Sequence, residues 1–101
     1  MIELKSNNFD AEIANGVTVV DFWAPWCGPC KMLTPTIEEL STEMTNVKFA
    51  KLNVDEAQDV AINYSVMSIP TIIIFKDGKA MESTIGVLPK ATIKSKIESV
   101  L

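Results

Sequence analysis

The sequence predicts an α/β fold in which a mixed central β-sheet of four to five strands is sandwiched between about four helices. Three observations carry this prediction. Segments of strand character alternate with segments of helical periodicity, which is typical of βαβ units and of a partly parallel sheet. The runs VTVV and TIII are apolar throughout, as strands covered by helices on both faces require. A late Asp-Gly pair indicates a hairpin, and so an antiparallel edge.

The first half of the chain is expected to hold two helices and two strands. Phe9 and Ile13 lie four residues apart behind Asn and Asp start signals, and Asn15-Gly16 ends this first helix. A β-branched and aromatic run of strand length follows, then a long helix after the two cysteines, then a second strand. These elements are expected at residues 5–16 (helix), 17–23 (strand), about 28–45 (helix) and 47–54 (strand).

The second half is expected to add a short helix, a hairpin and a closing helix. Asp77-Gly78 is a strong signal for a two-residue hairpin turn between the last two strands. Apolar residues recur at helical spacing in both helical segments. The elements are residues 56–64 (helix, with Ala57, Val60, Ala61 and Tyr64 on one side), 71–76 and 79–85 (strands), and 90–101 (helix, with Ile93, Ile97 and Val100 inward).

Length and charge exclude several classes of protein. The 101 residues predict one domain, residues 1–101, and a monomer is the default expectation. Nine lysines are scattered among thirteen acids at a net charge of −4, which argues against a nucleic-acid surface. No apolar run approaches the ~20 residues of a membrane span. The start lacks the pattern of a signal peptide, so a cytoplasmic location is expected.

The two cysteines, Cys27 and Cys30, are expected to be a redox pair. Cys30 begins a stripe of apolar residues at spacings of three and four, so it heads the inward face of the long helix. Cys27 lies at the helix start, where free N–H groups and the helix dipole lower the pKa of a thiol. We therefore expect Cys27 to be the exposed nucleophile and Cys30 the sheltered thiol that resolves the mixed disulfide. Gly28 and Pro29 keep the turn compact.

Three other interpretations of the cysteine pair fit the sequence less well. Two buried structural thiols would not require Gly-Pro between them or Trp26 beside them. A static disulfide would close a very short loop and stabilise little in the chain-entropy model. A zinc site needs four ligands, and a chain with two thiols and no histidine reaches that number only across a dimer. Reversible dithiol–disulfide exchange is favoured, with no metal expected. Absence of histidine also removes Ser-His-Asp and Cys-His catalysis.

Asp21 and Lys51 are the charged residues that interrupt apolar strands. A carboxylate inside a covered sheet is costly and usually has a raised pKa. Asp21 is a candidate base that takes the Cys30 proton; the alternative is a carboxylate at a strand end or facing solvent. Lys51 is a candidate partner for Asp21; the alternative is a lysine that extends to solvent.

Several motifs together resemble the thioredoxin family over essentially the whole chain. They are WCGPCKM within VVDFWAPWCGPC, then KLNVDE, SIPT, IFKDGK and IGVLPK, in that order. A single C-x-x-C in a βαβ setting is already typical of thioredoxin-like redox proteins. The resemblance implies the thioredoxin fold and the reduction of protein disulfides.

The resemblance also implies roles for individual residues. Cys27 matches the attacking thiol, Cys30 the resolving thiol, Asp21 the buried acid of the family and Lys51 the lysine paired with it. Pro70 matches a cis-proline beside the disulfide, with Ile69 presenting backbone to the substrate. The implied substrate surface comprises Trp26, Gly28, Pro29, Ile69, Pro70, Gly86 and Val87. Met67 departs from many relatives and is expected to affect partner choice.

The family resemblance implies partners but no bound cofactor. Electrons would come from NADPH through a flavoprotein thioredoxin reductase, or from a ferredoxin-dependent reductase, and would pass to many disulfide-containing proteins. Two alternatives stay open: a disulfide oxidase or isomerase on the same fold, and a non-redox binding subunit. Oxidases and isomerases often carry histidine at the position of Pro29. Proline offers no positive charge to stabilise the Cys27 thiolate, so the sequence favours a reductant.

Overall fold

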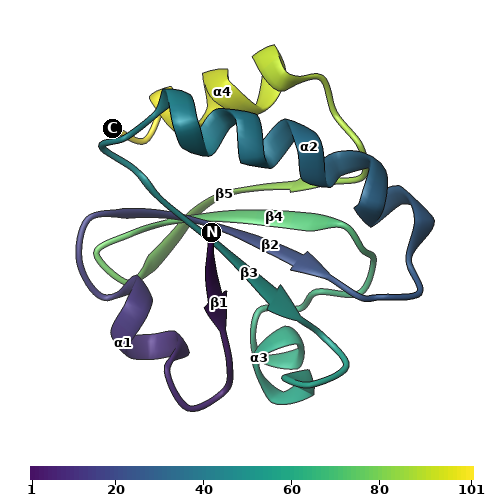
Figure 1. Ribbon diagram of the computed structural model, residues 1–101. Coiled ribbons are helices and arrows are strands. Elements are labelled where there is room, and N and C mark those ends of the chain that lie inside the picture. The colour runs from purple at the N-terminus through teal and green to yellow at the C-terminus, as the bar shows by residue number, and fades with distance from the viewer.

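The computed structural model describes all residues 1–101 and places a five-stranded sheet between two layers of helices (Figure 1). Helices α2 and α4 cover one face of the sheet, and α1 and α3 cover the other. The strand order is β1-β3-β2-β4-β5. The elements are β1 (Ile2–Leu4), α1 (Phe9–Ile13), β2 (Val17–Trp23), α2 (Gly28–Glu43), β3 (Lys48–Asn53), α3 (Gln58–Asn63), β4 (Thr71–Lys76), β5 (Lys79–Ile85) and α4 (Lys90–Glu98).

The sheet is mixed, as the sequence predicts. Strands β1, β3 and β2 are parallel, whereas β4 is antiparallel to β2 and β5 is antiparallel to β4. The sheet has five strands, within the predicted four to five. The fifth strand is β1, which the sequence pattern does not indicate. It has only three residues, of which Leu4 alone is buried, and three residues give no readable alternation.

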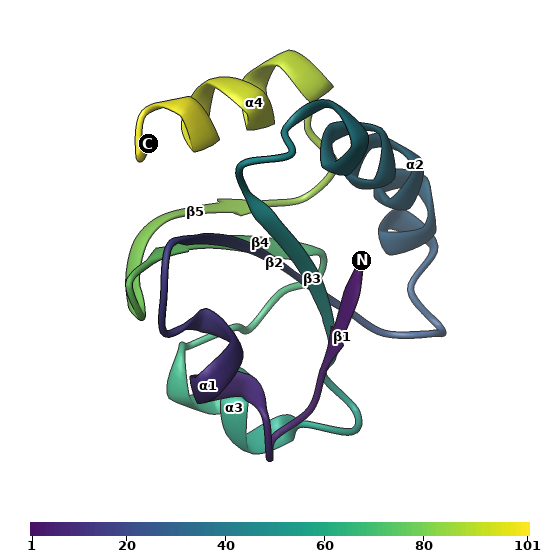
Figure 2. The same cartoon turned by 60° about the vertical axis from the view of Figure 1, so that its left-hand side comes forward.

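Two apolar cores lie on opposite faces of the sheet, beneath the two helix layers that Figure 2 shows. Successive residues of a strand point to opposite faces, so Val19 packs under α2 and α4 while Val20 packs against α1 and α3. This alternation explains why the central strands are apolar at every position. The residues predicted to face inward are buried: Cys30, Leu33, Ile37, Leu40 and Met44 in or directly after α2, and Ile93, Ile97 and Val100 in or after α4.

The helices are shorter than the sequence indicated, most clearly at α1 and α4. Helix α1 covers Phe9–Ile13 rather than 5–16, and α4 ends at Glu98 rather than at the last residue. Only the turns that bury Phe9, Ile13, Ile93 and Ile97 are regular. Short helices are marginal in water without such packing, so their exposed flanks adopt turns.

Two residues other than glycine have positive φ angles, and both close turns. Asp77 (φ 51°) and Gly78 (φ 85°) form the predicted hairpin turn between β4 and β5. The side chain of Asp77 accepts a hydrogen bond of 2.8 Å from the N–H of Gly16, so the turn also holds the loop before β2. Ser65 (φ 57°) follows α3. Its N–H bonds to the Ile62 carbonyl, and the Val66 N–H to the Ala61 carbonyl.

Replacing Ser65 with glycine is expected to stabilise the fold. The two hydrogen bonds form a Schellman motif, whose left-handed position is usually glycine because a Cβ is strained there. Relief of that strain exceeds the added entropy of the unfolded glycine, for a net gain of about 0.5–1 kcal/mol. Urea unfolding measures this gain. Ser68→Gly, in the same segment but without positive φ, is the control; equal effects at both positions would contradict the explanation.

Candidate active site

The two cysteines lie where β2 leads into α2, and they form a disulfide with a Cα–Cα separation of 5.3 Å. Cys27 is the N-cap of α2, and its Sγ accepts a hydrogen bond of 3.2 Å from the Cys30 N–H. Pro29 lies in the first turn, where a missing N–H costs nothing. The N-cap position places Cys27 Sγ among the free N–H groups of the helix, which favour negative charge on sulfur.

The expectation that Cys27 is exposed was wrong. Its exposed fraction is 4%, and that of Cys30 is 1%. Both belong to a buried cluster with Ala24, and Trp23, Val54 and Ile69 pack against this cluster. The cover over Cys27 comes from the loop before β4, where the Ile69 carbonyl oxygen lies 3.9 Å from Cys27 Sγ. Cys30 is the less exposed of the two, as predicted. The predicted difference between an exposed and a sheltered cysteine is not found, because both are buried.

Asp21 is buried in the centre of the sheet, with an exposed fraction of 2%. It lies on the same face of β2 as Val19, the face that α2 covers, and Cys30 heads the inward face of α2. Burial raises the pKa of Asp21 from 3.8 to about 6, and the positive charge of Lys51 opposes that rise. Its Oδ1 accepts no hydrogen bond from the protein, so the cost of burial is largely uncompensated.

Lys51 lies beside Asp21 without forming a salt bridge to it. The two residues are partners in the β2–β3 register, and Lys51 is half-buried. Its Nζ lies 5.2 Å from the centroid of the Trp23 ring, a cation–π distance. Lys51 therefore acts on Asp21 through space, which lowers the pKa of the carboxyl but leaves the carboxylate oxygen free to take a proton.

The loop before β4 lies against the disulfide. The Ile69–Pro70 peptide bond is cis, which agrees with what the resemblance implied. The Gly86 N–H donates a hydrogen bond of 2.8 Å to the Pro70 carbonyl, which holds the loop after β5 next to the loop before β4. Val87 in that second loop is 43% exposed. The structure thus places Ile69 beside Cys27, 42 positions away in the sequence, and joins Gly86 to Pro70.

The family model for thioredoxin matches residues 1–99 of this chain. The chain belongs to the thioredoxin family. It is 46% identical to the thioredoxin of Bacillus subtilis (strain 168) over 95 residues, which cover 93% of this chain and 91% of the relative. It is 44% identical to the thioredoxin of Staphylococcus saprophyticus over 99 residues, covering 97% and 95% of the two chains.

A solved structure shares the thioredoxin fold of this chain with a TM-score of 0.90 and 33% identity, covering 98% of this chain and 94% of the other. That chain comes from work on the thiol resolving mechanism of a yeast mitochondrial 1-Cys peroxiredoxin via glutathione and thioredoxin systems. The family and the Cys27–Cys30 pair make this protein a thiol–disulfide oxidoreductase. Membership of the thioredoxin family implies a reductase as electron donor and disulfide-containing substrates.

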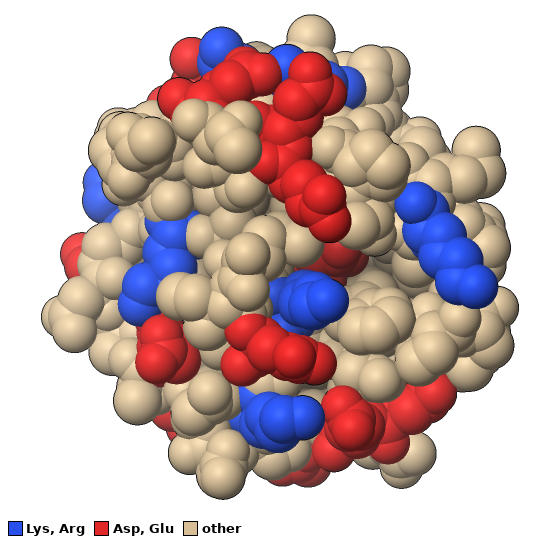
Figure 3. All heavy atoms as spheres, viewed as in Figure 1, with Lys and Arg blue, Asp and Glu red and all other residues tan.

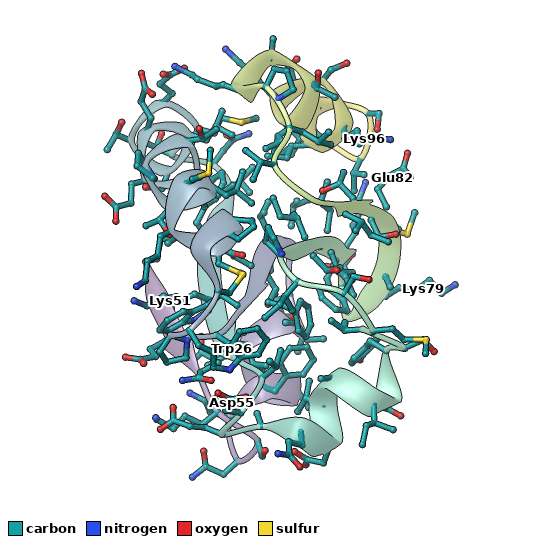
Figure 4. The ribbon with its side chains drawn as sticks, turned by 90° about the vertical axis from the view of Figure 1, so that its right-hand side faces the viewer. Trp26, Lys51, Asp55, Lys79, Glu82 and Lys96 are labelled. Atoms are coloured by element: carbon teal, nitrogen blue, oxygen red, sulfur yellow. A yellow bond between two sulfur atoms is a disulfide. The ribbon has the colours of Figure 1, made fainter.

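Trp26, which precedes the redox pair in the chain, is 70% exposed. Its Nε1–H donates a hydrogen bond of 2.9 Å to Asp55, and Figure 4 shows the two side chains together below Lys51. Asp55 was not among the predicted site residues. The only signal was its place in the KLNVDE motif, in the turn that follows β3. The hydrogen bond restricts the orientation of the exposed Trp26 ring.

The rest of the surface adds no second centre of this kind. Lysines and acidic residues are interspersed on the face shown in Figure 3. No group of three or more His, Cys, Asp or Glu side chains is arranged to hold a metal ion. No helix has both the length and the apolar character needed to cross a membrane.

Proposed function

We propose that this member of the thioredoxin family reduces disulfides of other proteins, with Cys27 attacking and Cys30 resolving. In the reduced protein, the Cys27 thiolate attacks one substrate sulfur, forms a mixed disulfide and releases the other sulfur as a thiol. Cys30 then attacks Cys27 Sγ, which restores the Cys27–Cys30 disulfide and releases the second substrate thiol. The observation that carries this assignment is the N-cap position of Cys27, with the Cys30 N–H directed at its sulfur.

Asp21 is the proposed proton acceptor for Cys30, and Lys51 adjusts its pKa. Cys30 becomes a competent nucleophile only when its thiol proton is removed. A buried carboxyl with a pKa of about 6 is ionised at neutral pH yet basic enough to accept that proton. Lys51 lowers this pKa without occupying the carboxylate in a salt bridge.

The substrate surface is proposed to surround the disulfide. A substrate sulfur that reaches Cys27 must pass the Ile69 carbonyl, which lies 3.9 Å from Cys27 Sγ. The backbone there offers hydrogen bonds to an extended chain and requires no particular side chain. The proposed contact residues are Trp26, Gly28, Pro29, Ile69, Pro70, Gly86 and Val87.

The proposed setting is a monomer of one domain, residues 1–101, in the cytoplasm. A dithiol reductant suits a compartment in which thiols are kept reduced. The electron donor is proposed to be a flavoprotein that takes electrons from NADPH, or alternatively a ferredoxin-dependent reductase. Both would pass electrons as a dithiol to the Cys27–Cys30 disulfide, so this chain needs no cofactor of its own.

The reduction potential of the Cys27–Cys30 couple tests the direction of the reaction. A reductant is expected to have a midpoint near or below the cytosolic glutathione poise, roughly −220 to −320 mV. The measurement is equilibration in a dithiol redox series, with free thiols counted by alkylation. A midpoint above about −200 mV would instead indicate an oxidase or isomerase.

Replacing Pro29 with histidine is expected to raise this potential. An imidazolium in the first turn of α2 stabilises the Cys27 thiolate, and a more stable reduced form makes the disulfide more oxidising. Pro29→Ala is the control, because it removes the ring without adding charge. A Pro29→His potential equal to that of Pro29→Ala would show that charge near Cys27 does not set the potential.

A further inference from the structure

A groove of about 450 Å³ lies on the sheet face opposite α2 and α4, between the segment 64–68 and the β4–β5 hairpin. Two methionines, Met67 and Met81, line it from opposite sides, and we call it the methionine groove. Tyr64, Ile73 and Ile85 supply further apolar wall. Glu82 is the only charged residue in the lining, so the groove offers no cation to an anionic ligand such as a phosphate.

The groove exists because α3 is too short to cover the last strand. Helix α3 has six residues, and the chain turns back at Ser65 towards β4. Thr84 of β5 is buried on the face covered by α4, so its neighbours in the strand face the other way. There Ile85 stays 67% exposed, while Met67 on the facing segment is 93% exposed. Met81 lies at an irregularity in the β4–β5 register, and it also lines the groove and is 48% exposed.

One end of the methionine groove adjoins the disulfide. Its wall includes Ser68, the residue before Ile69, whose carbonyl oxygen lies 3.9 Å from Cys27 Sγ. On the other side its wall includes Ile85, which precedes Gly86, and the Gly86 N–H is bonded to the Pro70 carbonyl. A polypeptide whose sulfur contacts Cys27 and whose chain extends along residues 67–69 would therefore reach this end of the groove.

We propose that the methionine groove binds a large apolar side chain of the substrate polypeptide, located two or three residues from the cysteine that Cys27 attacks. This inference rests on the proposed reduction of protein disulfides. Met67 precedes Ile69 by two positions in the chain. An extended substrate chain advances about 3.3 Å per residue, so two or three of its residues are enough to follow the loop from Ile69 to Met67. Methionine side chains are flexible and polarisable, and adapt to apolar groups of different shape. The groove would thus favour apolar flanking residues without selecting one sequence.

The test compares two peptides that differ only beside the cysteine. Each carries one cysteine in a mixed disulfide with thionitrobenzoate, and the variable position, two or three residues away on either side, is leucine or serine. The wild type is expected to reduce the best leucine peptide with a kcat/KM about tenfold higher than its serine counterpart, equivalent to about 1.4 kcal/mol. This preference should fall to near onefold in Met67→Gln and persist in Met67→Leu.

Two controls separate the groove from the redox chemistry. Met32→Gln changes a methionine that is 69% exposed and lies outside the groove, and should keep the leucine preference. A small disulfide without a peptide chain should be reduced at the wild-type rate by all three variants. Suppose that the wild type reduces the small disulfide at a normal rate but shows no preference for the leucine peptide, or that Met67→Gln shows the same preference as the wild type. Either result would overturn the proposed role of the groove and leave the proposed function intact. Failure of the wild type to reduce any disulfide would overturn the proposed function and this inference with it.

A spectroscopic measurement reports contact without turnover. The chain has five methionines, so ¹³C-methyl methionine spectra resolve each one after assignment by substitution. In a stable mixed disulfide between Cys27 of Cys30→Ser and the leucine peptide, the Met67 and Met81 methyl signals should shift relative to the serine peptide. Shifts confined to Met32 would place the flanking residue elsewhere and overturn the proposal.

Discussion

Cys30→Ser is expected to accumulate substrates as stable mixed disulfides on Cys27. The first exchange step needs only the Cys27 thiolate, whose position at the N-cap of α2 is unchanged by the substitution. The second step needs a thiol at residue 30, and a serine hydroxyl does not displace a sulfur from a disulfide at neutral pH. Turnover of a protein disulfide should therefore fall by at least about a thousandfold, with one equivalent of substrate bound covalently. Non-reducing electrophoresis and mass spectrometry measure both effects.

Cys27→Ser is the matched variant for this experiment. It keeps one thiol and loses the other, but the remaining thiol is the deeper one, with an exposed fraction of 1%. We expect neither turnover nor trapping from it. If Cys27→Ser trapped substrates and Cys30→Ser did not, the roles of the two cysteines would be reversed.

The double variant Cys27→Ser, Cys30→Ser distinguishes reductant from binding subunit. It keeps the apolar surface around Trp26, which is 70% exposed, but has no thiol. A cell that depends on this protein as a reductant should not be rescued by the double variant. Full rescue would show that the main role is binding.

Asp21→Asn is expected to stabilise the oxidised protein by about 3 kcal/mol at pH 7. The pKa of Asp21 is about 6 in the folded protein against 3.8 for the ordinary carboxyl. Each unit of pKa difference corresponds to about 1.36 kcal/mol. Because the folded-state pKa is the higher one, the folded protein binds the proton more tightly. The contribution of Asp21 to stability is therefore largest below about pH 4 and is lost as the pH rises through 6.

Urea unfolding of the oxidised protein between pH 3.5 and 8 measures this effect. The asparagine variant carries no charge at residue 21. Its free energy of unfolding should therefore rise above that of the wild type between pH 4 and 6, and the difference should stay constant at higher pH. Lys51→Met is the companion variant, because loss of its positive charge should raise the pKa of Asp21 further. A stability difference between Asp21→Asn and wild type that did not vary with pH would contradict a raised folded-state pKa.

The same substitution is expected to slow disulfide reduction. Asparagine accepts no proton from Cys30, so release of the mixed disulfide should lose its pH dependence at pH values near the pKa of Asp21. Stopped-flow kinetics between pH 6 and 9 would reveal this loss. Wild-type kinetics in the variant would remove Asp21 from the proton path, whatever its effect on stability.

The sequence by itself determined the elements whose pattern is local. Cys30, Leu33 and Ile37 follow helical spacing, which alone places them on one inward face of α2. The same helix also determines which thiol is more deeply buried, because residue 27 precedes the first turn and residue 30 lies within it. Asp21 stands out because an acid in an apolar strand has no local reason to be there. The three-residue strand β1 had too few residues for any pattern.

Only the tertiary structure decided what depends on segments far apart in the chain. Cys27 is covered by Ile69, 42 residues away, and so is buried rather than exposed. The pKa of Asp21 reflects the helix above it and Lys51 on the next strand. The methionine groove joins Met67 to a different strand at the place where α3 stops. Local periodicity shows which face a residue takes on its own element. The neighbours on the other side of that face are set by how the elements pack.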